Sequence, residues 1–426
     1  MTDCSRHGWR PYAQGVPTLV HDLDLPHLDV SSNEDREARL AAQEAIAREH
    51  WLARGNLGFA VVRYEDVVSI LRDRRWHSAA SKVAELSGVT DPTYLGRRRE
   101  SILSAEGDVH TRLRRLVAPA FSPRAADRLR PFMREVMSEL IAAIAPTGHA
   151  DAAVALCEPY PIPIICELLG APRADWQRFS RWATDVLRIF DFNLAEDLPV
   201  IMRAQDELDA YTRDLIAQRR HLPSDDLLTS LIAAEEAGDR LSTEELVMMV
   251  EAVIVGGTDT TRNQLGLALA LFAEHPAQWA LLAQRPELAP RAVEEVMRFA
   301  GAVRGTARIA NEDIEYRDVL FPRGTLLATS LAVANRDEGV FPEPDRFDIT
   351  REPVGQPQLT FGSGIHYCLG ASLARAELQE ALPLLAQRLP GLRVDGPVAY
   401  KTALAGIYGP TSLPVAFDRA ADPHVA

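Results

Sequence analysis

Cys368 is the residue of this chain whose surroundings point most clearly to chemistry. It lies in the segment FGSGIHYCLGASLARAE, residues 361–377, among Gly362, Gly364 and Gly370. Glycine permits backbone conformations and close approaches that other residues forbid, so the segment is typical of a tight loop. Helical sequence follows, and the amide N–H groups at a helix N-terminus stabilise a thiolate, the form of cysteine that binds metals. From the glycine spacing alone, a glycine-rich turn that buries a cysteine remains the alternative.

The full segment resembles the haem-binding signature of the cytochrome P450 superfamily, FGxGxHxCxGxxLAR, at every fixed position. The resemblance implies one haem b, with Cys368 as the sulfur ligand to the iron and Gly370 among the cofactor-binding residues. It also implies that Phe361 packs near the sulfur and that His366 lies near a haem propionate. A thiolate ligand donates electron density to the iron and favours cleavage of the O–O bond.

A second segment, GGTDTT at residues 256–261, interrupts a long apolar helical pattern. Two glycines inside a helix cost roughly 1 kcal/mol each relative to alanine, so they require a reason. One reason is close packing against a neighbouring helix. The other, which the resemblance favours, is room for oxygen and substrate, with Gly256 against the cofactor. The resemblance also makes Asp259 and Thr260 the acid and alcohol that supply protons during oxygen activation.

Basic residues upstream match the family's binding sites for the haem propionates. His110 and Arg114 are four residues apart and therefore share a helix face. Buried carboxylates require cationic partners, and the resemblance assigns these two residues and Arg308 to the propionates. The proline-containing acidic run that precedes this helix in the family is replaced by GDVH at residues 107–110. The start of this helix is therefore open, and a solvated basic face is the alternative.

Glu295 and Arg298 form an ExxR pattern, which places the two side chains on one helix face. The resemblance implies that this pair binds a third residue, an arginine in the loop before the cysteine. Arg346, in the sequence FPEPDRF, is our match for that arginine. We expect these three residues to stabilise the fold and to take no part in catalysis.

The remaining pattern predicts a mainly α protein with a small β lobe, as in the prism-like P450 fold. Ser122 and Pro123 are typical of a helix start and predict a helix to about residue 145. Ser242 and Glu245 form a capping box that opens a helix reaching to about Glu274. Further helices are expected over 175–190 and 197–220, strands at 58–63 and 324–332, and an irregular loop over 341–357.

Composition limits the class of protein. The formal net charge is −14, which argues against general binding of nucleic acid. Four cysteines, at positions 4, 157, 166 and 368, fit neither a zinc site nor a disulfide framework. The most apolar stretch, 246–272, contains charged residues that are costly in lipid, so we expect no membrane insertion and a cytoplasmic protein. We divide the chain into an N-terminal extension, 1–30, and a single haem domain, 31–426.

The resemblance spans roughly residues 58–417 and implies a soluble, bacterial-type monooxygenase that uses O2 to hydroxylate an apolar small molecule. The sequence has no nucleotide fingerprint and no cysteine set for an iron–sulfur cluster, so electrons are expected from a separate ferredoxin and its reductase. Arg112, Arg115 and Arg375 are candidates for the docking patch. Arg304 is a charge in an otherwise apolar pocket, with substrate or solvent as its partner. A non-hydroxylating P450 (coupling, desaturation or peroxygenase) and a haem sensor are the alternatives.

Overall fold

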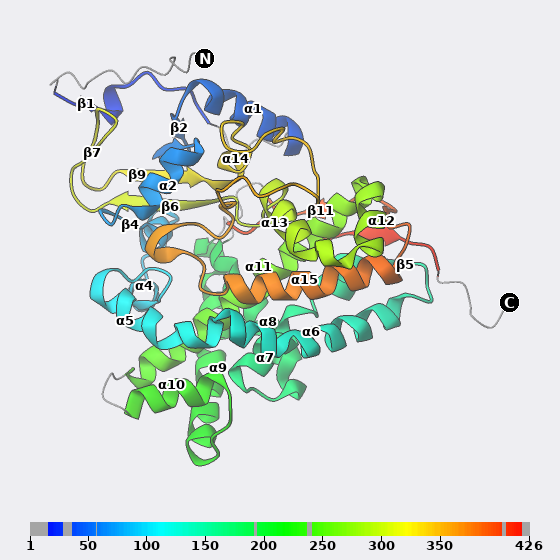
Figure 1. Cartoon of the computed structure of the whole chain (residues 1–426). Coiled ribbons are helices and arrows are strands. Elements are labelled where there is room, and N and C mark those ends of the chain that lie inside the picture. The colour runs from blue at the N-terminus through cyan, green and yellow to red at the C-terminus, as the bar shows by residue number, and fades with distance from the viewer. Residues whose placement is uncertain are drawn as a thin grey trace.

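The computed structural model describes residues 16–28, 36–56, 58–190, 194–236, 241–402 and 406–419. Figure 1 shows helices over most of the molecule and a smaller lobe of strands, beside which the N-terminal helices lie. The predicted class, mainly α with a small β lobe, is confirmed. The α-helices are α1 (Arg36–Glu49), α2 (Tyr64–Arg72), α3 (Ala80–Leu86), α4 (Pro92–Glu100), α5 (Gly107–Val117), α6 (Pro123–Ile144), α7 (Pro161–Leu169), α8 (Trp176–Val186), α9 (Leu194–His221), α10 (Leu227–Glu236), α11 (Thr243–Glu274), α12 (Pro276–Gln284), α13 (Ala289–Phe299), α14 (Leu331–Ala334) and α15 (Ala371–Arg388).

Local sequence accounts for where the longer helices begin. The Ser122 hydroxyl accepts a hydrogen bond from the backbone N–H of Ala125, and proline occupies the first turn of α6. At the start of α11 the predicted capping box is present in both directions between Ser242 and Glu245. α9 begins at Leu194, three residues earlier than expected, and residues 191–193 lie outside the described part of the chain.

The β lobe is built on a five-stranded sheet of order β2-β3-β9-β6-β4. Both predicted strands occur in it, although each is shorter than expected, and they pair in parallel with Phe59 opposite Leu327. The strands of this sheet are β2 (Leu52–Gly55), β3 (Gly58–Val61), β4 (Trp76–Ser78), β6 (Gly305–Ala310) and β9 (Leu326–Ser330). The smaller sheets contain β1 (Thr18–Leu19), β7 (Ile314–Tyr316) and β8 (Val319–Phe321); β5 (His149–Asp151), β10 (Arg393–Val394) and β13 (Pro414–Ala416); and β11 (Ala399–Tyr400) with β12 (Pro410–Ser412).

Residues before position 30 take part in this lobe. β1 pairs in parallel with β8, and the side chains of Val20 and Leu28 are buried. The domain boundary at residue 30 stays a prediction, but residues 18–28 contribute to the packing of the sheet. No helix among the described residues is long and apolar enough to cross a membrane.

The central element is α11, which has 32 residues and is about 48 Å long at 1.5 Å per residue. It is helical throughout, so the GGTDTT segment does not interrupt it. It packs against α7, α8, α9, α12 and α15, and most of its side chains are buried. Because α15 follows the Cys368 loop directly, its contact with α11 brings that loop near the middle of the long helix.

Candidate active site

The loop before α15 is held by backbone contacts that require glycine. Gly364 has a φ of +72°, and a Cβ there would overlap the carbonyl group of Leu71 at the end of α2. The N–H of Cys368 donates to the carbonyl of Phe361 over 2.9 Å, which closes the loop. Gly370 caps α15, and no heavy atom lies within 4 Å of the position its Cβ would take. One side of the loop therefore faces open space next to Cys368.

Opposing effects act on the pKa of the Cys368 thiol. Burial raises its pKa, while a hydrogen bond from the N–H of Gly370 and the charges of Arg114 and Arg375 lower it. Burial is the larger effect and the pKa is raised overall, so the loop alone does not produce a thiolate. A coordinated metal ion removes the thiol proton itself. The other described cysteines, Cys157 and Cys166, are buried, and burial raises the pKa of both thiols.

Phe361 lies in the same loop, and its packing near the sulfur stays a prediction. Its ring is buried, and the Arg375 guanidinium lies over it at 4.5 Å from the ring centroid. Arg375 also pairs with Glu294 on α13, over 2.5 Å, and donates to the Tyr367 hydroxyl. These contacts fix the aromatic ring and the cysteine loop to the helix that carries the ExxR pattern.

His110 and His366 come together from α5 and the cysteine loop. Their ring centroids are 4.5 Å apart, and His366 Nε2 lies 2.9 Å from the carboxylate of Glu106. Sequence reasoning missed Glu106, which lies directly before the GDVH segment and also accepts the backbone N–H of Ser78. Burial alone would raise the pKa of Glu106, but these hydrogen bonds outweigh it and the pKa is lowered.

Part of the hydrogen-bonding capacity around this histidine pair is unused. His110 is 2% exposed, and its Nε2 has no hydrogen-bond partner in the described structure. Burial, His366 and Arg114 lower the pKa of His110 to about 4. Arg308 on β6 is buried, and burial lowers its pKa to about 10; it donates only to Thr306 and the carbonyl of Ala307.

These donors test whether the site fits the cofactor that the cysteine signature implies. Arg114 and Arg308 have no carboxylate within ion-pair distance among the described residues. The buried Nε2 of His110 has no hydrogen-bond partner there. Buried cations and orphaned donors are costly unless an anion pairs with them. Two carboxylates close to a cysteine loop would satisfy all three side chains, and haem carries two such groups on one edge. The residues present therefore fit haem.

The two glycines of α11 have different roles. A Cβ on Gly257 would overlap the side chain of Ile165 on α7, so this glycine serves close helix packing. Gly256 is exposed, and a Cβ there would meet nothing within 4 Å. Thr260 lies one turn later, and its hydroxyl donates to the carbonyl of Gly256 over 2.7 Å. Close packing therefore accounts for Gly257, while room for oxygen and substrate stays a prediction for Gly256, where the structure has open space.

Asp259 and Thr260 are neighbours in sequence, but no hydrogen bond joins their side chains in the described structure. The Asp259 carboxylate is 2% exposed and pairs with Arg262 on its own helix. Its second oxygen pairs over 2.7 Å with Lys401, which follows β11 and lies 142 positions away in the chain. Sequence reasoning missed Lys401, because nothing in the pattern connects it with α11. The acid is thus buried and held by two cations.

A further acid that sequence reasoning missed lies between α11 and α15. Glu377 is 1% exposed, and one of its oxygens accepts the Thr261 hydroxyl over 3.1 Å. Its other oxygen has no partner in the described structure. Burial raises the pKa of Glu377 to about 8, so this carboxyl is protonated at neutral pH. It is the last residue of the signature segment, which was the available signal.

The ExxR prediction needs one correction. Glu295 and Arg298 form a buried pair at 2.8 Å, as expected. The third member is Arg351, whose Nε donates to both oxygens of Glu295 over 3.1 and 3.0 Å. Arg346 was the wrong assignment, because its side chain is 60% exposed and pairs with acids of its own loop. Arg346 contributes only its backbone carbonyl, which accepts from Arg298 and Arg351.

Arg304 does not extend into solvent as one alternative had it. Its guanidinium lies 4.2 Å from the centroid of the Tyr408 ring, a cation–π contact. Tyr408 in turn stacks on Tyr400, with ring centroids 5.5 Å apart. A bridge between Val303 and Ile407 joins the two segments beside this contact.

Comparison with known proteins agrees with this geometry. The model of the family described as Cytochrome P450 matches residues 175–284 and 277–390. The mycinamicin IV hydroxylase/epoxidase of Micromonospora griseorubida is 39% identical over 85% of this chain and 90% of that protein. The nocardicin C N-oxygenase of Nocardia uniformis subsp. tsuyamanensis is 37% identical over 92% of this chain and 94% of that protein.

A solved structure gives the same result for the fold. The crystal structure of CalO2 superposes with a TM-score of 0.86 at 32% identity, over 93% of this chain and 100% of that one. Each of the two sequence relatives exceeds 30% identity over most of both chains. The chain therefore belongs to the cytochrome P450 family, whose members are haem-thiolate monooxygenases.

Proposed function

We propose that this P450 binds haem b through Cys368 and inserts one oxygen atom of O2 into an apolar small molecule made by a biosynthetic pathway. The observation that supports this most strongly is a set of three side chains near the cysteine loop, His110, Arg114 and Arg308. None of the three has a carboxylate within ion-pair distance in the described structure, and His110 Nε2 has no hydrogen-bond partner there. These side chains would bind the two propionates, together with His366. Phe361 and Gly370 would lie next to the sulfur. The cofactor supplies the oxidising power, and the protein binds, orients and protects it.

The residues of α11 would supply protons and leave room for oxygen and substrate beside the cofactor. Gly256 leaves room for oxygen and substrate, and the Thr260 hydroxyl is one turn away. We assign Thr260 as the alcohol that passes protons and Asp259 as the acid that supplies them. Because Lys401 and Arg262 hold Asp259, the carboxylate must leave one of these cations to reach the alcohol. Proton delivery thus includes a side-chain movement that the two cations oppose.

For the electron donor we propose a ferredoxin with its reductase, acting in the cytoplasm. The expected docking patch is less basic than the sequence implied, because Arg112 pairs with Glu245 and Arg375 with Glu294. Arg115 is exposed on α5, the helix that carries Arg114 toward the sulfur. Arg115→Glu should slow the first electron transfer from a reduced ferredoxin, measured by stopped-flow. An unchanged rate would remove this residue from the docking surface.

The overall proposal is tested by product analysis. The holoenzyme, a surrogate ferredoxin, its reductase and NAD(P)H would be supplied with a library of apolar compounds under ¹⁸O2. We expect products that carry one labelled oxygen atom. Coupled or desaturated products without label would instead support the non-hydroxylating alternative, and haem binding without any turnover would support a sensor.

A further inference from the structure

A small cavity lies between α4, α9 and α11, beside the proposed active site. Much of its wall is apolar, with Leu103, Ile189, Met248 and Val255 among the lining residues. Val255 directly precedes Gly256, so the cavity borders the part of α11 that we assign to oxygen and substrate. The wall on the side of α4 is different, because it carries two adjacent arginines.

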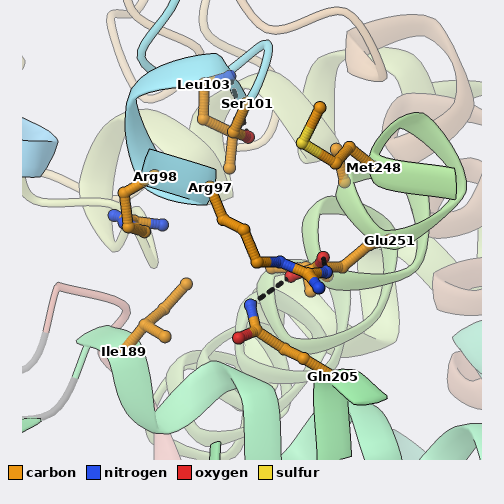
Figure 2. A pocket seen from close by; sticks show the side chains of 10 residues that line it. Arg97, Arg98, Ser101, Leu103, Ile189, Gln205, Met248 and Glu251 are labelled. Carbon is orange, nitrogen blue, oxygen red and sulfur yellow. Dashed lines mark hydrogen bonds and ion pairs between the residues drawn. The ribbon is translucent and has the colours of Figure 1, made fainter. Parts of the chain in front are cut away.

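Both terminal nitrogens of Arg97 are engaged with acids of the opposite helices, while its Nε has no partner in the described structure. Its guanidinium pairs with Asp209 on α9 and with Glu251 on α11, each at 2.6 Å. Gln205 donates to the second oxygen of Glu251 over 2.6 Å, and Figure 2 shows this bond together with Arg97 reaching toward Glu251. Each of the four carboxylate oxygens accepts one of these hydrogen bonds. Arg97 therefore links α4 to α9 and α11 by ion pairs.

Arg98 is adjacent but has no such engagement. In Figure 2 it extends from the same turn of α4 on the side of Ile189, away from the Arg97 cluster. It is 8% exposed and lines the cavity, and it forms no hydrogen bond or ion pair among the described residues. One turn earlier, the hydroxyl of Tyr94 is buried without a partner as well. Residues four apart share a helix face, so two unsatisfied donors lie together.

We propose that Arg98, assisted by the Tyr94 hydroxyl, binds a carboxylate of the substrate at the α4 end of this cavity. A buried guanidinium with free N–H groups is costly, and its planar fork matches the two oxygens of a carboxylate. The apolar remainder of the cavity then holds the substrate body toward Gly256. This deepens the proposed function, because it rests on the cavity being the substrate site and names the class, an apolar molecule with one acidic group.

The test compares acids with their esters on the holoenzyme. The probes are dodecanoic acid with methyl dodecanoate, and lithocholic acid with its methyl ester. Binding would be measured by equilibrium dialysis and by the change in haem absorbance. For at least one pair we expect the acid to bind about tenfold more tightly than the ester, or about 1.4 kcal/mol. In Arg98→Met that preference should disappear, because methionine keeps an apolar side chain of similar length but lacks the guanidinium group.

Arg99→Met is the matched control, since Arg99 is the next residue of α4 and its side chain is 58% exposed. It should keep the full preference for the acid. If Arg98→Met does not retain haem, Arg98→Lys keeps the charge without the fork and should reduce the preference. Equal binding of acid and ester in the wild type, or a preference that survives either change at Arg98, overturns the inference. Labelled products from uncharged compounds would then leave the proposed function standing.

Discussion

Replacing Glu377 by glutamine tests the electrostatics of the core between α11 and α15. The carboxyl is buried against Thr261, and the Tyr160 hydroxyl donates to its backbone carbonyl over 2.9 Å. Burial raises the pKa of Glu377 from 4.5 to about 8. Between these two values the folded protein holds a proton that the unfolded chain releases, so stability must fall as the pH rises.

The size of the effect follows from the pKa shift. Each unit of pKa difference corresponds to about 1.36 kcal/mol, so the loss between about pH 5 and about pH 7.5 is roughly 3 kcal/mol. Glutamine does not titrate, and Glu377→Gln should therefore lack this loss. The free energy of unfolding of the variant minus that of the wild type should increase by roughly 3 kcal/mol over this range.

Urea unfolding of the holoenzyme at several pH values, followed by tryptophan fluorescence, would measure this difference. Taking the difference between variant and wild type cancels the other titrating groups. Glu139→Gln, an exposed carboxyl on α6, is the control, and its difference should stay small and nearly constant. A difference for Glu377→Gln that does not change with pH would refute the reasoning, because it would mean that Glu377 is ionised in the folded protein.

Three further predictions address the site and its support. Thr260→Ala should keep the haem but divert electrons to hydrogen peroxide, measured as peroxide and product per NAD(P)H; undiminished coupling would exclude Thr260 as the proton-relay alcohol. The double variant His110→Ala, Arg114→Ala should lose haem on dialysis, since each charge-assisted bond contributes about 1.5–3 kcal/mol; full retention would contradict the propionate assignment. Arg351→Ala should lower the free energy of unfolding by about 3–5 kcal/mol, and Arg346→Ala by about 1 kcal/mol or less; equal effects would restore the original assignment.

The sequence was sufficient wherever a short segment determines its own geometry. The Cys368 loop, the capping box at Ser242 and the i, i+4 pair of His110 and Arg114 are local patterns, and their elements occur as expected. The proximity of His366 to His110 was not predicted as such, because the resemblance placed each of them only near a haem propionate.

Local sequence patterns could not predict which side chains pair when they are far apart in the chain. Lys401 reaches Asp259 from a distant sheet, and no spacing rule connects them. Arg346 and Arg351 lie in one irregular loop, where no helical or strand period indicates which arginine turns inward. The partner of Gly257 is a side chain on α7, so only the packed structure separates its role from that of Gly256.

The central claim is that Cys368 ligates the haem iron. The most direct measurement is the absorbance spectrum of the reduced, carbon-monoxide-bound protein, in which thiolate-ligated haem gives a band at unusually long wavelength. We expect the wild type and Cys157→Ser to show this band and Cys368→Ser to lack it while still binding haem. A Cys368→Ser protein that retains the band would contradict the assignment, because a different cysteine would then be the ligand.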